Sequence, residues 1–186
     1  MRYASCRDHY GGLTECGGRH IIFLVKAMKI GVVSDTHVSR VDQLPANLLE
    51  MLEEVDLVVH LGDYTGIELL DGLRSLGDFR GVFGNMDSSE VRAELPEKEV
   101  IELGGKRLGL IHGWGAPSGI HGRIKDRFGS VDAVLYGHTH MAENELVWGT
   151  LFFNPGSATG RFPAESKTFG ILVIEESIQG EIIAIE

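Results

Sequence analysis

The sequence lacks a long apolar run and has almost no cysteine. Near the N-terminus the longest wholly apolar run covers residues 21–25, and five residues can neither cross a bilayer nor form the core of a signal peptide. Only two cysteines, Cys6 and Cys16, occur in 186 residues, which is too few for a disulfide scaffold. We therefore expect a protein of the reducing cytoplasm that has no membrane partner.

Basic residues are also scarce, with 17 lysines and arginines against 27 acidic residues and a formal net charge of −10. Such a charge repels a polyanion, so stable nucleic-acid binding is not expected. Clustered divalent cations would reverse the sign locally and could attract a single phosphate group. The charge therefore favours a small phosphorylated substrate.

Glycine, in contrast, is abundant, because 25 glycines are about twice the usual share for a chain of this length. Many of them stand beside polar residues at the ends of apolar runs, where the chain must turn tightly. A length of 186 residues with 43% hydrophobic residues is typical of one globular domain.

Residues 1–27 differ from the rest of the chain. They contain both cysteines and little hydrophobic periodicity, and the apolar segment that follows begins at Met28. We therefore expect residues 1–27 to be an N-terminal extension outside the core and residues 28–186 to form a single domain. The alternative is a Cys/His metal site in the extension, although its spacing fits no common zinc pattern. That site would use Cys6, His9, Cys16 and His20.

From residue 29 onward, short apolar segments alternate with segments of helical spacing. The sequence predicts strands at 30–34, 57–61 and 80–83 and helices at 45–54 and 67–76. This alternation is typical of a parallel sheet covered by helices.

The pattern changes after residue 99. Two glycines between apolar runs predict a hairpin, and the strands of the tail are expected to be mostly antiparallel. The expected elements are a hairpin at 100–111, a helix at 119–128 and strands at 133–136, 145–148, 151–153, 169–174 and 181–185. One domain with two sheets is the simplest interpretation.

Five short motifs follow the apolar runs, and each contains residues that commonly bind metal ions. They are Asp35-Thr36-His37, Gly62-Asp63, Gly84-Asn85, His112-Gly113 and Gly137-His138-Thr139-His140. Loops that leave the carboxyl ends of parallel strands converge on one edge of a sheet. Two carboxylates, four imidazoles and one amide are enough donors to hold two divalent ions there. Each motif alone would more often be a turn, a cap or a hydrogen-bonded histidine, but all five in order favour a metal centre.

Together with Asn154-Pro155-Gly156-Ser157, these motifs resemble those of the calcineurin-like metallophosphoesterases, most closely the small prokaryotic phosphodiesterases. The resemblance covers about residues 29–175. It implies an α/β fold in which two mixed β-sheets stack face to face and helices flank them, giving four layers.

The same resemblance implies two ion sites that share one carboxylate. The first site would be formed by Asp35, His37, Asp63 and His140. The second would be formed by Asp63, Asn85, His112 and His138, with Asp63 as the bridge. Manganese is the expected ion, and nickel, iron or zinc would also suit the mixed carboxylate and imidazole set. The resemblance also favours a homodimer or homotetramer.

The implied activity is hydrolysis of phosphodiesters, with weaker hydrolysis of phosphomonoesters, by attack of a hydroxide that bridges the two ions. Asp63, Asn85 and His112 are the expected catalytic residues, together with that hydroxide. No serine or cysteine stands in a nucleophile motif, so no covalent intermediate is expected. The alternative is a catalytically weak protein-binding scaffold of the same fold, but every expected ligand is present.

One position departs from the wider family. Many larger members have a histidine directly after the asparagine, where it protonates the leaving group, whereas this chain has Met86, which cannot transfer a proton. We therefore expect a preference for good leaving groups or strained cyclic phosphates. The neighbouring Asp87 is expected to orient a ligand histidine.

Five further residues are expected to have other roles than binding metal. We expect His60 to be buried, His121 to face solvent on a helix and Arg161 to lie at the surface. Trp114 and Trp148 are expected to be packing residues rather than platforms on which a ligand stacks.

Overall fold

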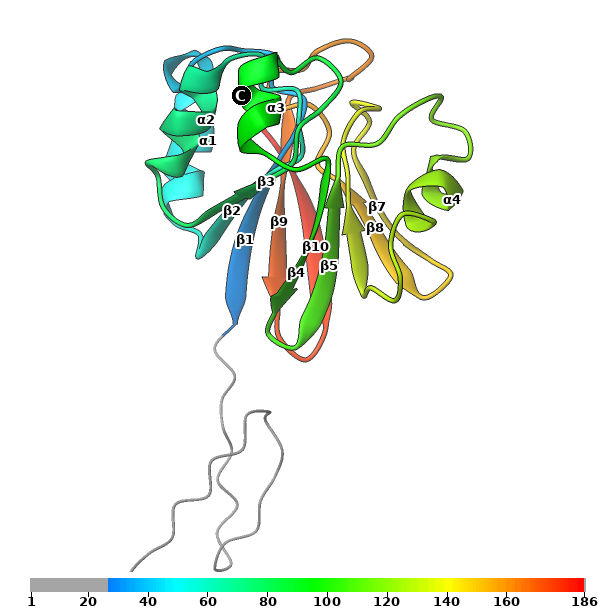
Figure 1. Cartoon of the computed structure of the whole chain (residues 1–186). Helices are drawn as coiled ribbons and strands as arrows, with labels where there is room; N and C mark the ends of the chain where they lie inside the picture. The colour runs from blue at the N-terminus through cyan, green and yellow to red at the C-terminus, as the bar shows by residue number, and fades with distance from the viewer. Residues whose placement is uncertain (1–26, 186) are drawn as a thin grey trace, which may run out of the picture.

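The computed structural model describes residues 27–185, which form two five-stranded sheets. The first sheet has the order β10-β9-β1-β2-β3. Its strands are β1 (Met28–Val33), β2 (Leu57–His60), β3 (Phe79–Gly81), β9 (Thr168–Ile174) and β10 (Ile178–Ala184) (Figure 1). β1, β2 and β3 are mutually parallel, whereas β9 is antiparallel to β1 and to β10. This sheet is therefore mixed.

The second sheet has the order β4-β5-β6-β8-β7. Its strands are β4 (Lys98–Leu103), β5 (Lys106–Ile111), β6 (Ala133–Leu135), β7 (Glu143–Val147) and β8 (Thr150–Asn154). The predicted hairpin of β4 and β5 is confirmed, and both turn glycines have the positive φ that such a turn requires. β7 pairs antiparallel with β8, and β9 pairs antiparallel with β1 and β10, whereas β8 pairs parallel with β6, so the prediction of a mostly antiparallel tail is confirmed.

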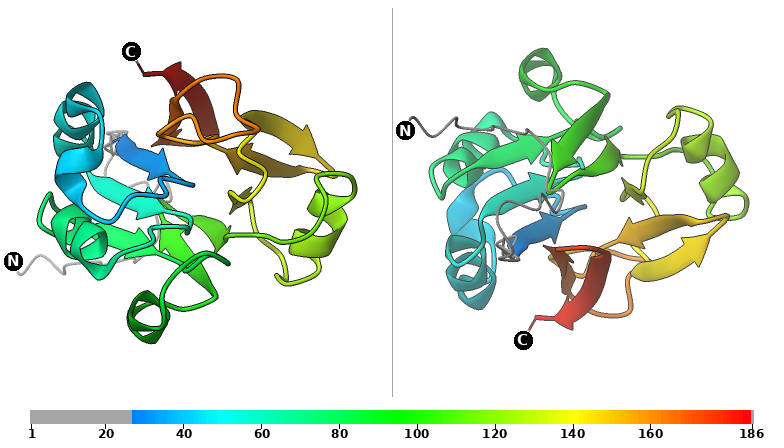
Figure 2. Two further views of the ribbon diagram at one scale, coloured as in Figure 1. Left: turned by 90° about the horizontal axis from the view of Figure 1, so that it is seen from above. Right: turned by 90° about the horizontal axis from the view of Figure 1, so that it is seen from below.

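Helices cover the outer faces of both sheets. They are η1 (Val41–Gln43), α1 (Ala46–Glu53), α2 (Ile67–Arg74), α3 (Ser89–Glu94) and α4 (Ile120–Lys125). α1 and α2 lie outside the first sheet, and α4 lies outside the second, as Figures 1 and 2 show. The expected four-layer arrangement of two mixed sheets between helices is confirmed. α3, which packs Val91 against the same cluster as α1 and α2, was not predicted.

The apolar runs at 30–33 and 57–59 lie in β1 and β2 and are buried on both faces of the sheet. In β1, Ile30 and Val32 belong to the cluster between the two sheets, whereas Val33 belongs to the cluster under α1 and α2. Successive side chains of a strand point to opposite faces, so a strand covered on both sides needs an unbroken apolar run. The inter-sheet cluster includes residues of both sheets, such as Leu110 of β5 and Leu172 of β9.

The topology directs five loops to one edge of the stacked sheets. β1, β2 and β3 run parallel in one sheet, and β5 and β6 run parallel in the other. The loops that follow these five strands carry the five predicted motifs. No helix within residues 27–185 is long and apolar enough to span a bilayer. The predicted extension and its Cys/His alternative fall outside the described residues, apart from position 27.

Candidate metal centre

The backbone of the motif loops adopts an unusual conformation at the predicted ligands. Five of them have positive φ angles between 48° and 71°, a region that residues other than glycine seldom occupy. They are Asp35, His37, Asp63, His138 and His140. Such backbone costs on the order of 1–3 kcal/mol per residue and persists where the surroundings fix it, which is common at functional sites.

Two motif glycines make room for the carboxylates. A Cβ atom on Gly84 would lie 2.2 Å from Asp63 Oδ1, and one on Gly137 would lie 1.9 Å from Ser34 Oγ and 2.7 Å from Asp35 Oδ2. No side chain fits at either position without displacing a carboxylate or its partner.

The first group of donors consists of Asp35, His37, Asp63 and His140, and one ligand atom from each lies within 4.8 Å of all the others. The Nε2 atoms of His37 and His140 are 3.2 Å apart. Asp35 Oδ1 lies 3.2 Å from His140 Nε2, and Asp63 Oδ2 lies 3.6 Å from His37 Nε2. This is the set predicted for the first ion.

The second group consists of Asn85, His112 and His138. Asn85 Oδ1 lies 3.1 Å from His112 Nε2 and 3.0 Å from His138 Nδ1. Asp63 Oδ2 lies 3.5 Å from His112 Nε2, so this oxygen stands between a histidine of each group. The structure thus brings all seven predicted donors together.

Backbone carbonyls orient three of the four histidines. His112 Nδ1 lies 2.7 Å from the Leu61 carbonyl oxygen, and His138 Nε2 lies 3.0 Å from that of Gly115. His140 Nδ1 lies 2.9 Å from the carbonyl oxygen of Arg161, whose side chain is exposed as expected. A carbonyl oxygen only accepts, so each of these nitrogens must donate a hydrogen.

In a neutral imidazole the other nitrogen then carries a lone pair, and all three lone pairs face oxygen atoms of the donor set. Two lone pairs that face each other repel, so a cation between the imidazole nitrogen and the oxygen is needed to make the contact favourable. Orientation of a histidine by a carbonyl behind it is also the usual support for a metal ligand. The residues present therefore fit divalent ions.

The electrostatics of the site point to the same need for positive charge. Burial opposes the charged form of His112, but its hydrogen bond to Asp63 and the nearby carboxylates outweigh burial and raise its pKa. The hydrogen bond to Asp35 raises the pKa of His140. Burial acts to raise the pKa of Asp63, but the contact with His112 prevails and lowers it to about 2. Cations bound at this site would take the place of those protons.

Asp87 has a different role from the one predicted. Its carboxylate accepts hydrogen bonds from four backbone N–H groups and contacts no ligand histidine. The donors are Asp63 at 3.0 Å, Tyr64 at 2.6 Å, Thr65 at 3.0 Å and Gly84 at 2.7 Å. The prediction that it orients a histidine was wrong, because Asp87 fixes the loop that carries Asp63 against the loop that carries Asn85.

Arg92 of α3 is a supporting residue that the sequence did not reveal. Its Nη2 donates to the carbonyl oxygens of Gly84 at 2.7 Å and Asn85 at 3.0 Å, and its Nε donates to that of Asp87. The local signal for α3 is Ser88, whose side chain caps the helix.

The Asn154–Ser157 segment joins two of the motif loops. Asn154 Nδ2 donates to the carbonyl oxygen of Gly137 and to Thr139 Oγ1, both at 3.0 Å. Ser157 Oγ donates to the carbonyl oxygen of Asp35 at 2.8 Å. A signature noted only for its resemblance therefore has a physical role, since it ties the loop after β1 to the loop after β6.

Of the two other histidines in residues 27–185, one fits its prediction and one does not. His60 is fully buried, contacts Thr36 Oγ1 at 3.1 Å and stacks on Tyr64, which confirms the prediction of a buried packing residue. The prediction that His121 faces solvent was wrong, because its ring packs on Phe152 and pairs with Glu143 beneath α4.

The two tryptophans pack only in part. Trp148 is 69% exposed, but its ring lies edge-on to that of the buried Phe152, with 6.4 Å between the centroids. Trp114 is 38% exposed, and the Arg127 guanidinium lies 5.4 Å from its ring centroid. Trp148 lies beyond the end of β7 in a turn with positive φ, and Trp114 follows the His112-Gly113 motif.

Comparison with known proteins identifies the family. The family model for the calcineurin-like phosphoesterase superfamily domain matches residues 28–177. A probable metallophosphoesterase of Methanocaldococcus jannaschii is 35% identical over 164 residues, covering 86% of this chain and 82% of that protein. A phosphodiesterase of the same organism is 30% identical over 173 residues, covering 84% of this chain and 99% of that one.

Solved structures agree. A novel archaeal phosphodiesterase superposes with a TM-score of 0.70 at 28% identity, covering 85% of this chain and 100% of that one. Wild-type Vps29 of Entamoeba histolytica, solved in complex with Zn²⁺, superposes with a TM-score of 0.62 at 31% identity, covering 84% of this chain and 99% of that one. The chain belongs to the calcineurin-like phosphoesterase superfamily.

Proposed function

We propose that this protein is a dinuclear metal-dependent phosphodiesterase, weaker on phosphomonoesters, in which a hydroxide shared by the two ions attacks phosphorus. The position of Asp63 carries the proposal. Its Oδ2 lies 3.6 Å from His37 Nε2 and 3.5 Å from His112 Nε2, and these histidines belong to different donor groups. A carboxylate oxygen between two imidazole sets is suited to bridge two ions.

Two bound ions would contribute Lewis acidity and an activated water. The chain itself holds the donors in place beforehand. Asp63 Oδ1 accepts a hydrogen bond from the Met86 backbone N–H at 2.8 Å, which leaves Oδ2 to face the histidines. Asp35, which is fully buried, accepts hydrogen bonds from Ser34 Oγ and from the backbone N–H of His138. Donors that are already oriented cost little rearrangement when ions and substrate bind.

The surroundings of Asn85 support a preference for good leaving groups. Met86 is 59% exposed beside Asn85 and has no proton to transfer. His60 cannot replace the missing acid, because burial lowers its pKa to about 3 and both ring nitrogens already contact Thr36 and Gly62. Replacement of Met86 by histidine should raise the rate on esters with poor leaving groups, and an unchanged rate would contradict this part of the proposal.

A protein-binding scaffold of the same fold is the second candidate. It is favoured by the similarity to Vps29, a protein named for vacuolar sorting, which in the Entamoeba histolytica structure is complexed with Zn²⁺. A metal site in this fold therefore does not by itself establish hydrolysis. The complete set of seven donors supports the enzyme.

Several finer features belong to the same proposal. The mixed carboxylate and imidazole donors support manganese, and nickel, iron and zinc would also suit them. The net charge of −10 supports a small phosphorylated substrate rather than a nucleic acid. A cytoplasmic homodimer or homotetramer, with residues 1–27 outside a single domain of residues 28–186, completes the proposal.

The test is removal and restoration of the metal. Protein dialysed against chelator should be inactive, and addition of single metals should restore hydrolysis, with manganese giving the highest rate. The substrates would be bis(4-nitrophenyl) phosphate, 4-nitrophenyl phosphate and the 2′,3′- and 3′,5′-cyclic nucleotides. Full activity without metal would refute the mechanism, and ion binding without hydrolysis of any ester would favour the scaffold.

A further inference from the structure

Exposed apolar side chains gather around the candidate metal centre. Among residues 27–185, seven large apolar side chains are exposed, and four of them adjoin the donors in the chain or by contact. Met86 directly follows Asn85, Trp114 follows the His112-Gly113 motif and Met141 directly follows His140. The fourth is Phe162, whose backbone carbonyl oxygen accepts from His140 Nδ1 and whose side chain is 90% exposed.

One pocket, here named the Trp114 pocket, opens beside the second donor group. It has a volume of about 370 Å³, and Asn85 and His112 form part of its wall. Phe83, Ile111 and Trp114 supply its apolar surface. An aromatic side chain that lines an apolar pocket is suited to stack on a planar group.

A second pocket, here named the Met141 pocket, opens beside the first donor group. It has a volume of about 250 Å³, and His140 forms part of its wall. Met141, Ala142 and Pro163 line it together with Glu165. The two pockets thus share walls with different donor groups, since one includes Asn85 and His112 and the other includes His140.

Neither pocket offers a free cation. Arg92 lines the Trp114 pocket, but its guanidinium donates to three backbone carbonyls and lies over the Phe83 ring. Glu97 in the same wall pairs with Arg127 at 3.1 Å. The Met141 pocket carries the carboxylate of Glu165 and no lysine or arginine. A second phosphate group would meet no basic partner in either pocket, whereas an uncharged group would suit both.

We propose that the two pockets hold the two ester groups of a phosphodiester whose phosphate lies at the metal centre. An aromatic group, such as an aryl ring or a nucleobase, would occupy the Trp114 pocket, and a smaller uncharged group would occupy the Met141 pocket. This inference rests on the proposed phosphodiesterase function and deepens it. The physical reason for a preference for diesters over monoesters is then that a monoester fills only one pocket.

Kinetics of substituted enzymes test the two pockets separately. With bis(4-nitrophenyl) phosphate, Trp114→Ala should raise KM about fivefold to tenfold because a ring contact is lost, and kcat should stay within about twofold. Met141→Glu should raise KM about fivefold or more, because it places a second carboxylate beside an anionic substrate. Inhibition by inorganic phosphate, which reaches neither pocket, should stay within about twofold for Trp114→Ala. Leu146→Ala, which removes a side chain that is 75% exposed on β7 and lines neither pocket, is the matched control.

Fluorescence gives a second readout that does not depend on turnover. The chain has two tryptophans, so Trp148→Phe leaves Trp114 as the single reporter. Diphenyl phosphate, whose phenol groups leave poorly, should change the Trp114 emission at saturable concentration in the metal-loaded protein. Inorganic phosphate should leave the emission unchanged.

The outcomes separate this inference from the proposed function. If the wild-type protein hydrolyses no ester with any metal, the proposed function fails, whereas a saturable response of Trp114 to diphenyl phosphate would still support the pockets. If the wild-type protein hydrolyses the diester but both substitutions leave KM within twofold and the emission does not move, the inference is overturned. The four exposed apolar side chains around the metal centre would then be available to a protein partner instead.

Discussion

The two donor groups of the metal centre differ in charge and in exposure. The first group contains both carboxylates, and Asp35 and Asp63 are 0% and 2% exposed. The second group contributes only neutral donors of its own, and one of them, Asn85, is exposed. Because attraction of a dication grows with the number of buried carboxylates, we expect the first ion to bind more tightly than the second.

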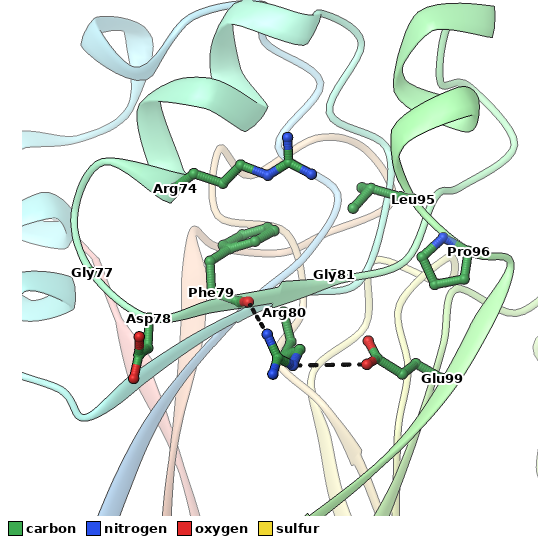
Figure 3. A pocket seen from close by; sticks show the side chains of 9 residues that line it. All are labelled: Arg74, Gly77, Asp78, Phe79, Arg80, Gly81, Leu95, Pro96 and Glu99. Carbon is green, nitrogen blue, oxygen red and sulfur yellow. Dashed lines mark hydrogen bonds and ion pairs between the residues drawn. The ribbon is translucent and has the colours of Figure 1, made fainter.

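A third region, a pocket without the metal-binding donors, serves as a comparison for the two donor groups. The pocket in Figure 3, with a volume of about 430 Å³, lies between β3 and the segment that follows α3, and both of its arginines are already paired. Arg80 Nε lies 3.7 Å from Glu99 Oε1, and Arg74 Nη1 lies 3.2 Å from Glu94 Oε2. Beyond these pairs the lining carries one more carboxylate, that of Asp78, whereas an ion site needs several donors that converge. At the metal centre, in contrast, two carboxylates and two imidazoles converge to within 4.8 Å of one another.

Asp63→Asn should weaken ion binding by both donor groups and so remove the difference in affinity between them. The bridge loses its charge, so we expect both ions to bind poorly and kcat to fall by about 10³-fold. Metal analysis after desalting and steady-state kinetics check this. Asp71→Asn, which neutralises an exposed carboxylate on α2, is the control, and equal activity of the two variants would contradict the bridging role.

Asn85→Ala should weaken ion binding by the second donor group and leave ion binding by the first group unchanged. We expect one ion per chain to be retained and one lost, with kcat lower by about 10²-fold. Titration calorimetry of the metal-free protein would show whether one tight site survives. Loss of both ions would indicate that the groups are not separable, and Asn144→Ala on β7 serves as the control.

Arg92→Ala tests whether the second group depends on its support from α3. Without the guanidinium, the carbonyl oxygens of Gly84 and Asn85 lose their donor, so the affinity for the second ion should fall about tenfold. Arg74→Ala is the matched control, because it removes an arginine that contacts Glu94 of α3 but not the loop. A similar loss of affinity in both variants would mean that α3 merely stabilises the fold.

His60 lies near charged residues of both donor groups, and its protonation should change the free energy of unfolding rather than the affinity for metal. Burial lowers its pKa to about 3 in the folded protein, against an unfolded value of 6.5. Below pH 6.5 the unfolded chain takes up a proton that the folded protein refuses, so stability falls as the pH falls toward 3. The loss should be about 1.4 kcal/mol per pH unit, or about 3 kcal/mol at pH 4.

Urea unfolding of the metal-free protein between pH 7 and pH 4 measures this loss. His60→Gln removes the titrating group, so its stability should fall less over the same range than that of the wild-type protein. Equal slopes for the two proteins would contradict a buried neutral histidine.

The sequence predicted the sheets and the donors for the same reason. Strands buried on both faces leave unbroken apolar runs, and the residues directly after each run must lie at the sheet edge. The donors of the motifs can therefore be recognised in the sequence as short polar segments that directly follow apolar runs. α3 left no such trace, because it has six residues and only Val91 is buried.

The supporting contacts could not be predicted, because they use the backbone. Asp87 binds four N–H groups and Arg92 binds three carbonyl oxygens, and every residue type presents the same backbone groups. The exposure of the tryptophans could not be predicted for a related reason. Tryptophan is highly buried on average, so its residue type does not reveal where one borders a site.

The bond from Ser157 Oγ to the Asp35 carbonyl oxygen joins residues 122 positions apart. Asn154 closes the loop after β6 from the same segment, and β9, which follows it, completes the sheet beside β1. During synthesis the first ligands therefore leave the ribosome long before the segment that secures them. We therefore expect the chain to bind ions only when its synthesis is nearly complete. A chain that ends before position 154 should not retain the ions.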